Sequence, residues 1–259
     1  MNRTASPAIG LELWTVRTDL NKDLMATLGA VARLGYESVE FFSTYLDWPV
    51  DYAREVRRRL DELGLACSST HNGMRAFTPE ALPKTIELND ALGSRLAVVA
   101  SVPKVATLDE WRQKTEAFAD VAERLRPHGI AAGFHNHQQE WTALDGERPI
   151  DIVASGTPQD FVLQFDVAPA VKAGVDCAAW IRAHSGRVRS IHGRDWSATR
   201  GENLAFGEGD APWAAIFDAA ETVGGVETYL VENGHCTPEE EFGIAERSIA
   251  NWRAMRASR

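Results

Sequence analysis

Eight short apolar runs alternate with longer amphipathic segments along the 259 residues of this chain, and this alternation constrains the fold more than any other feature. The apolar runs have the length of buried strands, and they lie at 9–16, 38–42, 65–71, 96–100, 130–136, 161–166, 188–192 and 228–232. The amphipathic segments have the length and periodicity of helices. Eight strand-helix units in about 250 residues predict a single-domain (β/α)8 TIM barrel that extends over residues 1–259.

Local signals support the expected helix boundaries. Gly35 and Gly64 follow two of the amphipathic segments, as glycine does after the last turn of a helix. Thr78-Pro79 is predicted to start the helix after the third strand, with threonine as the cap and proline in the first helical position. Thr107, three residues before Glu110, is predicted to cap the long helix after the fourth strand. The stretch 196–211 has no helical pattern and is expected to be a functional loop.

Composition limits the class of partner. The chain has 37 acidic and 27 basic side chains, a net charge of -10, which argues against a nucleic acid as the main partner. The first seven residues lack the apolar core of a signal peptide, and no apolar run reaches the length of a membrane span. These features predict a cytoplasmic protein with a small-molecule partner, no nucleic acid and no membrane. The three cysteines are expected to be reduced, and a homo-oligomer is compatible with the sequence.

Polar side chains follow the late strands at the point where each strand ends. Glu140 comes just after the fifth strand, and Asp166, His192 and Glu232 end the sixth, seventh and eighth. Because all strands of such a barrel end at one rim, these groups are expected to meet there. Without a cation, the repulsion between three carboxylates in a partly dry pocket would be strongly unfavourable. The sequence therefore predicts a divalent metal site with these four residues as ligands.

The donor set indicates which ions suit this site. Three carboxylates and one imidazole favour a divalent ion of intermediate hardness. Mn²⁺ is ranked first, and Co²⁺, Mg²⁺, Zn²⁺ and Fe²⁺ are the alternatives. No glycine-rich nucleotide motif follows a predicted strand, so a nucleotide cofactor is not expected.

The stretch Gly133-Phe-His-Asn-His-Gln-Gln-Glu-Trp141 places two imidazoles, an amide and a carboxylate within six residues. Strand alternation puts His135 and His137 on one face and Asn136 on the other. Polar groups of this kind at the end of a strand indicate chemistry. The alternative interpretation is a surface loop that happens to hold two histidines.

Several segments of the chain resemble the sugar phosphate isomerase/epimerase family of xylose isomerase-like barrels. That group includes inosose dehydratases, ketose 3-epimerases and type-2 apurinic endonucleases. The most specific part of the resemblance is the His-Asn-His-x-x-Glu element at 135–140, which is typical of one subgroup. The other parts lie at 11–17, 34–40, 64–71, 165–166, 192–195, 207–210 and 229–232, so the resemblance extends over nearly the whole chain.

The resemblance implies a metal-binding quartet of glutamate, aspartate, histidine and glutamate. Here the quartet falls on Glu140, Asp166, His192 and Glu232. Many relatives carry the first glutamate inside the fifth strand, where this chain has Gly133. Either Glu140 therefore reaches back to the metal, or His135 or His137 takes its place. Arg194 stands where relatives often have lysine.

A site of this kind predicts a metal-dependent sugar, keto-sugar or cyclitol isomerase or epimerase. A cation bound to a carbonyl oxygen and a neighbouring hydroxyl acidifies the hydrogen next to the carbonyl, because it stabilises the enediolate that forms. Glu232 and Glu140 are predicted to act as base and acid on opposite faces of the substrate. His137 is the third catalytic candidate, and His71 and His135 are predicted to donate to substrate oxygens.

The remaining predicted substrate-binding residues lie at other strand ends. Glu40 ends the second strand, although a structural ion pair is an equal alternative for it. Asp195 is predicted to orient His192 or to bind a substrate hydroxyl. Trp14 is predicted to form an apolar wall for a sugar ring, and Arg194 completes the set.

Three alternative functions remain beside the isomerase or epimerase. A metal-dependent lyase or dehydratase acting on a keto-sugar, inosose or 3-keto-glycoside would use the same proton removal. A phosphodiesterase like the type-2 apurinic endonucleases would need more metal ligands and a basic face. A non-catalytic binding barrel would keep the fold and lose the metal.

Overall fold

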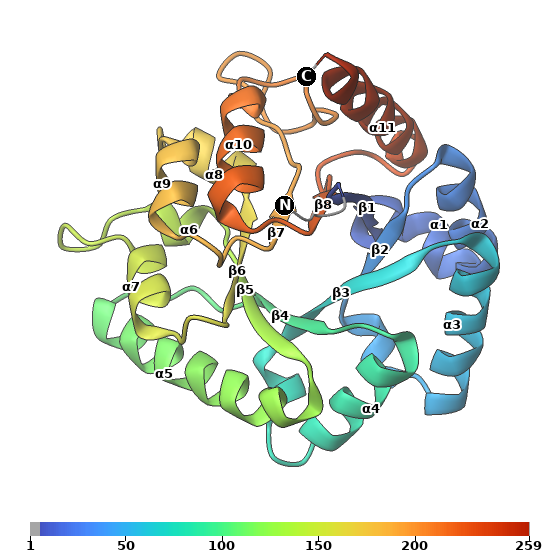
Figure 1. Ribbon diagram of the computed structural model, residues 1–259, viewed down its shortest axis with the longest axis horizontal. Coiled ribbons are helices and arrows are strands. Elements are labelled where there is room, and N and C mark those ends of the chain that lie inside the picture. The colour runs from blue at the N-terminus through green and yellow to red at the C-terminus, as the bar shows by residue number, and fades with distance from the viewer. Residues whose placement is uncertain (1–5, 259) are drawn as a thin grey trace.

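The computed structural model describes residues 6–258 and shows a closed barrel of eight parallel strands. The strands pair in chain order, and β8 returns to pair with β1. Helices surround the ring of strands on the outside (Figure 1). This confirms the predicted single-domain (β/α)8 barrel.

Each of the eight predicted runs overlaps one strand. The strands are β1 Ala8–Glu12, β2 Ser38–Phe41, β3 Ala66–Gly73, β4 Leu96–Ser101, β5 Ala131–His135, β6 Val162–Asp166, β7 Ser190–His192 and β8 Thr228–Val231. The first strand is shorter than expected because the chain turns into a 3₁₀ helix, η1 Leu13–Val16, directly after Glu12. The Glu12 carboxylate caps that turn by accepting a hydrogen bond of 2.8 Å from the Trp14 backbone N–H.

The helices follow the strands in the expected alternation. They are α1 Arg17–Lys22, α2 Leu24–Leu34, α3 Val50–Leu63, α4 Leu82–Leu92, α5 Leu108–Leu125, α6 Gln138–Trp141, α7 Pro149–Gly156, α8 Val167–Lys172, α9 Cys177–Ala183, α10 Trp213–Ala219 and α11 Glu241–Ala257. Shorter 3₁₀ and π turns are η2 Ser43–Asp47, η3 Met74–Phe77, η4 Arg126–His128 and η5 Ala220–Gly224. The helices α1, α6 and α8 were not expected, because one or two turns carry no readable periodicity.

One of the two predicted helix caps is confirmed, and the other is wrong. Thr107 caps α5 as predicted, since its Oγ1 accepts a hydrogen bond of 3.2 Å from the Glu110 backbone N–H. The prediction that Thr78 starts a helix is wrong, because α4 begins only at Leu82. Thr78 Oγ1 instead accepts a hydrogen bond of 3.3 Å from Ala81 N within a turn. Threonine followed by proline is as favourable for a turn as for a helix start.

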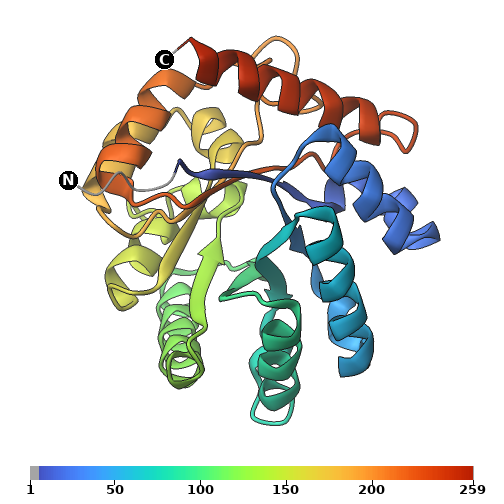
Figure 2. The same ribbon diagram turned by 45° about the vertical axis from the view of Figure 1, so that its right-hand side comes forward.

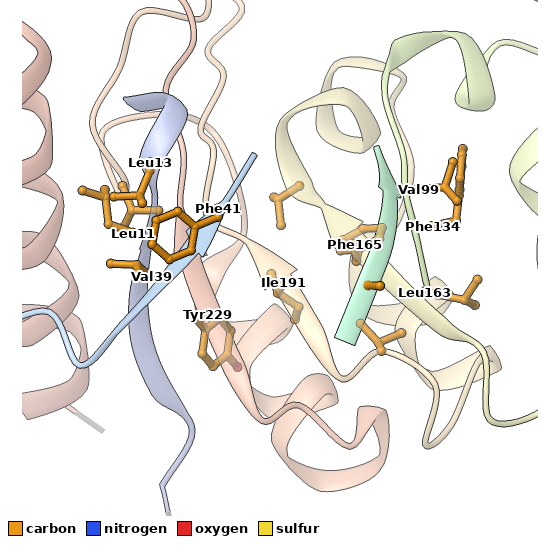
Figure 3. Close-up of a cluster of buried hydrophobic side chains, with 14 of the residues drawn as sticks. Leu11, Leu13, Val39, Phe41, Val99, Phe134, Leu163, Phe165, Ile191 and Tyr229 are labelled. Atoms are coloured by element: carbon orange, nitrogen blue, oxygen red, sulfur yellow. The ribbon is translucent and has the colours of Figure 1, made fainter. Parts of the chain in front are cut away.

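Side chains that point outward from the strands form the core between barrel and helices. Leu11, Val39, Phe134, Phe165 and Ile191 are at most 1% exposed and belong to one cluster (Figure 3). Burying each contributes roughly 1.5–3 kcal/mol. In the sequence each is followed at once by an acidic residue or a histidine. Because successive strand side chains point to opposite faces, the same alternation that builds the core sends polar groups into the barrel.

The interior of the barrel contains a polar network. Gln164 on β6 donates from Nε2 to Glu40 Oε1 on β2 over 2.8 Å and to Ser190 Oγ on β7 over 3.0 Å. Strands β2 and β6 are not neighbours in the ring, so the bond to Glu40 crosses the lumen. Branched apolar side chains usually fill the interior of this fold. Here polar side chains replace some of these apolar ones, so a candidate site can lie directly above the polar interior.

The first and last segments of the described chain pack together and complete the outer layer. Helix α11 packs against η1 and α2, and Figure 2 shows this dark red helix alongside the blue helices near the start of the chain. The Tyr36 hydroxyl donates to the Ala245 carbonyl over 2.8 Å, and Glu241 accepts a hydrogen bond of 3.0 Å from Thr18 N. Within residues 6–258, no helix combines the length and apolar character needed to cross a bilayer.

Arg187 is a buried cation on which we base a stability prediction. It is 7% exposed and donates to Ala154 O over 2.5 Å, to Thr157 Oγ1 over 2.7 Å and to Phe161 O over 3.4 Å. Arg187→Met would remove all three of these buried hydrogen bonds. We expect the free energy of unfolding to fall by roughly 2–4 kcal/mol, measured by urea denaturation.

Arg189→Met provides the matched control. Arg189 is on the same segment, and its guanidinium forms a solvent-accessible ion pair of 2.8 Å with Glu227. Exposed pairs contribute little, so its loss is expected to cost less than about 1 kcal/mol. Equal effects of the two substitutions would contradict the role given to Arg187.

Candidate metal and substrate site

Two overlapping groups of side chains meet at the carboxyl-terminal mouth of the barrel. His135, Asp166 and Glu232 form one group, and His71, His135 and His192 form the other. The ligand atoms of each group lie within 4.8 Å of one another. His135 Nε2 is 3.7 Å from Asp166 Oδ2 and 3.9 Å from Glu232 Oε2. Two atoms that each lie about 2.1 Å from one ion are at most about 4.2 Å apart, so these pairs have a suitable spacing for a shared cation.

Asp166 has the least satisfied carboxylate of the group. It is fully buried, and neither of its side-chain oxygens accepts a hydrogen bond. Burial raises the pKa of Asp166 to about 7, although the nearby Arg194 guanidinium opposes this shift. Arg194 Nε lies 3.2 Å from Asp166 Oδ2. Orphaned buried oxygens beside an imidazole and a second carboxylate are a donor set that fits a divalent cation.

His192 lies between two carboxylates. Its Nδ1 is 2.7 Å from Glu232 Oε2, and its Nε2 is 2.8 Å from Glu40 Oε2. Burial disfavours the imidazolium, but the two carboxylates outweigh burial and raise the pKa of His192 to about 10. Burial also disfavours the Glu232 anion, but Arg194 and His192 outweigh it and lower the pKa of Glu232 below its usual value. Glu232 is therefore ionised at neutral pH.

His135 presents a free nitrogen to Asp166 and Glu232. Its Nδ1 is 3.1 Å from Gln164 Oε1, and an amide oxygen can only accept, so Nδ1 carries the proton. The lone pair on Nε2 then faces the two carboxylates. Burial, reinforced by the His192 and His71 rings, holds the pKa of His135 well below its usual value. A neutral imidazole with one nitrogen oriented by a hydrogen bond is prepared for coordination.

Gly133 explains why the fifth strand contributes a histidine at its end. A Cβ at Gly133 would lie 2.9 Å from the Val162 carbonyl oxygen and 3.4 Å from Leu96 Cδ1. No carboxylate fits at that depth of the barrel. His135 is two residues further along the same strand, so its side chain points to the same face and reaches the mouth.

Glu140 lies in the short helix α6. Its Oε2 accepts a hydrogen bond of 2.6 Å from the His137 backbone N–H, and its Oε1 is buried without a hydrogen-bond partner. Burial raises the pKa of Glu140. Glu140 belongs to neither group of clustered ligand atoms in the described structure. Its position supports a capping role that orients the 136–138 turn, and its roles as metal ligand and catalytic acid stay predictions.

Glu40 lies beneath the histidines. Its Oε2 is 2.9 Å from His71 Nε2 as well as 2.8 Å from His192 Nε2, and its Oε1 accepts a hydrogen bond of 2.5 Å from Ser69 Oγ. The side chain is fully buried and does not line the cavity above. This position supports the structural alternative, in which Glu40 orients two imidazoles, over the predicted contact with substrate.

A cavity of about 340 Å³ opens above these groups. This volume is within the range of small-molecule sites. The cavity is lined by Glu12, Trp14, Phe42, Ser43, His71, Asn72, Gly73, Ala100, His137 and Glu232. The Trp14 and Phe42 rings meet edge to face with centroids 5.2 Å apart, and Trp14 is 43% exposed. Trp14 therefore lies where an apolar wall was predicted.

His137 and Glu12 both line this cavity, but only His137 was predicted from the sequence. His137 was predicted, and burial lowers its pKa to about 4, so it is neutral at pH 7. Glu12 was missed, because the first strand was expected to continue to Val16. Its carboxyl group is 1% exposed, and burial together with Glu232 and Glu40 raises the pKa of Glu12 well above its usual value. An acidic residue directly after the buried Leu11 was the signal available in the sequence.

Two predicted site residues, Arg194 and Asp195, follow β7, and only Arg194 lies in the site. Arg194 joins the site, since its Nη1 is 3.7 Å from Glu232 Oε1. Asp195 instead accepts hydrogen bonds from Gly207 N over 2.9 Å and from Trp213 Nε1 over 2.9 Å. Asp195 thereby anchors the loop at 196–211, and this position supports a structural role over the predicted contact with His192 or substrate.

The closed barrel and its mouth define the class of protein: a TIM barrel with a His/Asp/Glu group that can hold a metal ion. The family model for xylose isomerase-like TIM barrels matches residues 28–252, so this chain belongs to that family. The resemblance seen in the sequence is confirmed at this level. The family consists mainly of enzymes that isomerise or epimerise sugars.

Individual relatives are more distant. The L-ribulose 3-epimerase of Mesorhizobium japonicum is 25% identical over 82% of this chain and 75% of its own length. The rhizopine catabolism protein MocC of Rhizobium meliloti is 29% identical over 58% of this chain, and the match spans only 43% of that protein. A sugar phosphate isomerase/epimerase structure from Parabacteroides distasonis has a TM-score of 0.80 and 23% identity, with 98% of this chain and 96% of that chain covered.

Proposed function

We propose that this protein is a divalent-metal-dependent isomerase or epimerase that removes the proton next to the carbonyl group of a sugar, keto-sugar or cyclitol. The observation that carries the proposal is the convergence of His135, Asp166 and Glu232 at the carboxyl-terminal mouth, beside a cavity of about 340 Å³. The relationship to an L-ribulose 3-epimerase supports a carbohydrate substrate.

His135, Asp166 and Glu232 would hold the ion, and His192, 2.7 Å from Glu232, is the next candidate ligand. A bound divalent ion supplies positive charge that stabilises the negative charge developing on substrate oxygens as the proton leaves. The mixture of carboxylate oxygen and imidazole nitrogen keeps Mn²⁺ as the first choice among the proposed ions.

Glu232 is the proposed base. It lines the cavity with its side chain 11% exposed, so a substrate can reach it. Arg194 and His192 keep it ionised, and a base must be ionised to accept a proton. The neutral imidazole of His137 is proposed to exchange hydrogen bonds with substrate oxygens. Glu140 stays the proposed acid on the opposite face.

The fate of the proton decides the reaction type. Its return to the opposite face of the same carbon gives an epimer, and its delivery to the neighbouring carbon gives an isomer. A dehydratase acting on a keto-sugar, inosose or 3-keto-glycoside would share the first step and then expel a hydroxyl group. Product analysis separates these outcomes, and the same residues carry the shared step.

Solvent exchange tests the proposal without requiring the physiological substrate. In deuterated water with Mn²⁺, the protein is expected to introduce deuterium next to the carbonyl of at least one member of a panel of ketopentoses, ketohexoses, inososes and 3-keto-glycosides. L-ribulose is the first probe. The gain of deuterium is followed by NMR, and a chelator should abolish it because the ion stabilises the developing charge. If the metal-loaded protein exchanges no member of the panel, the proposal fails.

A further inference from the structure

We propose that Glu12 is a specificity-determining residue whose free carboxyl oxygen hydrogen-bonds a hydroxyl group of an unphosphorylated sugar held between the Trp14–Phe42 wall and Glu232. The inference rests on the proposed function. Glu12 is neither a proposed metal ligand nor a proposed acid or base, so that function does not already use it. Within the described structure, Glu12 belongs to neither group of clustered metal-type ligands.

The position of Glu12 follows from strand register. Glu12 pairs with Glu40 across β1 and β2, and Leu11, the residue before it, pairs with Val231, the residue before Glu232. The three acidic residues therefore come from neighbouring strands at the same level of the barrel. Glu40 is bonded to histidines beneath the site, so Glu12 and Glu232 are the carboxyl groups that line the cavity.

The two oxygens of Glu12 have different surroundings. Its Oε2 accepts the Trp14 backbone N–H over 2.8 Å and is thereby held in place. Its Oε1 is buried without a hydrogen-bond partner, in a side chain that is 1% exposed and lines the cavity. Buried polar atoms of folded proteins almost always have partners. A ligand hydroxyl in the cavity would provide the missing partner, because a hydroxyl can both donate and accept.

Trp14 places this oxygen next to an apolar surface. Its ring is packed edge to face against Phe42 and lies 5.1 Å from the Arg17 guanidinium carbon. Gly234 permits this position, since a Cβ there would come within 3.2 Å of Trp14 Nε1. A carbohydrate matches both surfaces, because its C–H face can pack against the aromatic rings and its hydroxyl groups can bond Glu12.

The charge of the cavity indicates that the sugar is not a phosphate ester. Among the described residues, no lysine or arginine lines the cavity, whereas two carboxyl groups do. Two guanidinium groups adjoin the lining residues Glu232 and Trp14, and both are already paired, Arg194 with Asp166 at 3.2 Å and Arg17 with Glu241 at 3.6 Å. Phosphate recognition in proteins relies on arginine, lysine or exposed backbone N–H groups. A neutral polyhydroxy substrate fits this lining.

The test uses the ketose that the wild-type protein exchanges fastest in deuterated water, its monodeoxy analogues and its terminal phosphate ester. Wild type is expected to show kcat/KM about 10- to 100-fold lower for one deoxy analogue than for the parent sugar, the effect of one hydrogen bond to a carboxyl group. Glu12→Ala should lower kcat/KM for the parent sugar by a similar factor. For the deoxy analogue, which lacks the hydroxyl group, Glu12→Ala should have the same kcat/KM as wild type. This coupling in a double-mutant cycle identifies a direct contact.

Two variants separate recognition from folding. Glu12→Gln keeps an oxygen for the Trp14 N–H and an amide that can bond a hydroxyl, so it should recover part of the activity on the parent sugar. Glu241→Gln is the matched control, because Glu241 is a fully buried carboxylate that bonds Thr18 and lies outside the cavity. It should leave the preference between parent and deoxy sugars unchanged.

The outcomes are distinguishable. If the wild-type protein exchanges no sugar, the proposed function fails and this inference fails with it. If exchange occurs but Glu12→Ala keeps the wild-type ratio between every deoxy analogue and the parent, the role of Glu12 is refuted while the proposed function stands. A phosphate ester used as efficiently as the free sugar would overturn the substrate class.

Discussion

Glu232→Gln is expected to lower kcat for proton exchange by at least about 1,000-fold while leaving the fold intact. The amide cannot take up a proton at neutral pH, so the proposed base is lost. It also donates less electron density to a cation than a carboxylate does. The measurement is the rate of deuterium incorporation under saturating Mn²⁺ and sugar, compared with wild type.

The control for this prediction is Glu227→Gln. Glu227 pairs with Arg189 beside β8 and lies outside the cavity, so its loss should leave exchange within about two-fold of wild type. The circular dichroism spectrum should be unchanged in both variants, because Gln has the shape of Glu and its amide oxygen can still accept a hydrogen bond from His192 Nδ1. Full activity of Glu232→Gln would exclude it as the base.

His135→Ala is expected to weaken Mn²⁺ binding by at least about 100-fold. Loss of a residue that only supports a ligand already costs about 10- to 100-fold, and a direct ligand should cost no less. Its Nε2 faces both Asp166 and Glu232, at 3.7 Å and 3.9 Å, so its removal opens the group on one side. Calorimetric titration of chelator-treated protein with Mn²⁺ provides the affinity.

Glu140→Gln distinguishes the two assignments of the fifth-strand ligand. An amide oxygen can still accept the His137 backbone N–H, so the α6 cap is preserved. We expect Glu140→Gln to retain Mn²⁺ affinity within about three-fold of wild type. The opposite result, with His135→Ala binding normally and Glu140→Gln binding weakly, would restore the quartet that begins with Glu140.

Much of the fold was predictable because the strands of this barrel have a regular pattern. Runs such as 161–166 are short, apolar and bounded by turn residues, and each of the eight strands overlaps one predicted run. Boundaries were less predictable. The first run continues in apolar residues past Glu12, but the carboxylate captures the Trp14 N–H and ends the strand. A single hydrogen bond of this kind leaves no trace in periodicity.

The candidate site was predictable in part. Asp166 and His192 end their strands and Glu232 directly follows β8, and the rule that barrel strands end at one rim predicts that these residues converge. The depth to which each side chain reaches was not predictable. Glu40 and Glu12 are register partners, yet one is bonded to histidines beneath the site and the other lines the cavity.

By itself, the sequence determined the repeating architecture and the strand ends that carry polar groups, since both follow from local alternation of apolar and polar residues. Only the tertiary structure decided which of those groups lie together. Partners such as Gln164 and Glu40 are 124 positions apart and meet across the lumen. Their contact depends on barrel closure and on the space left by Gly133, which are properties of all eight strands together and of no single stretch of chain.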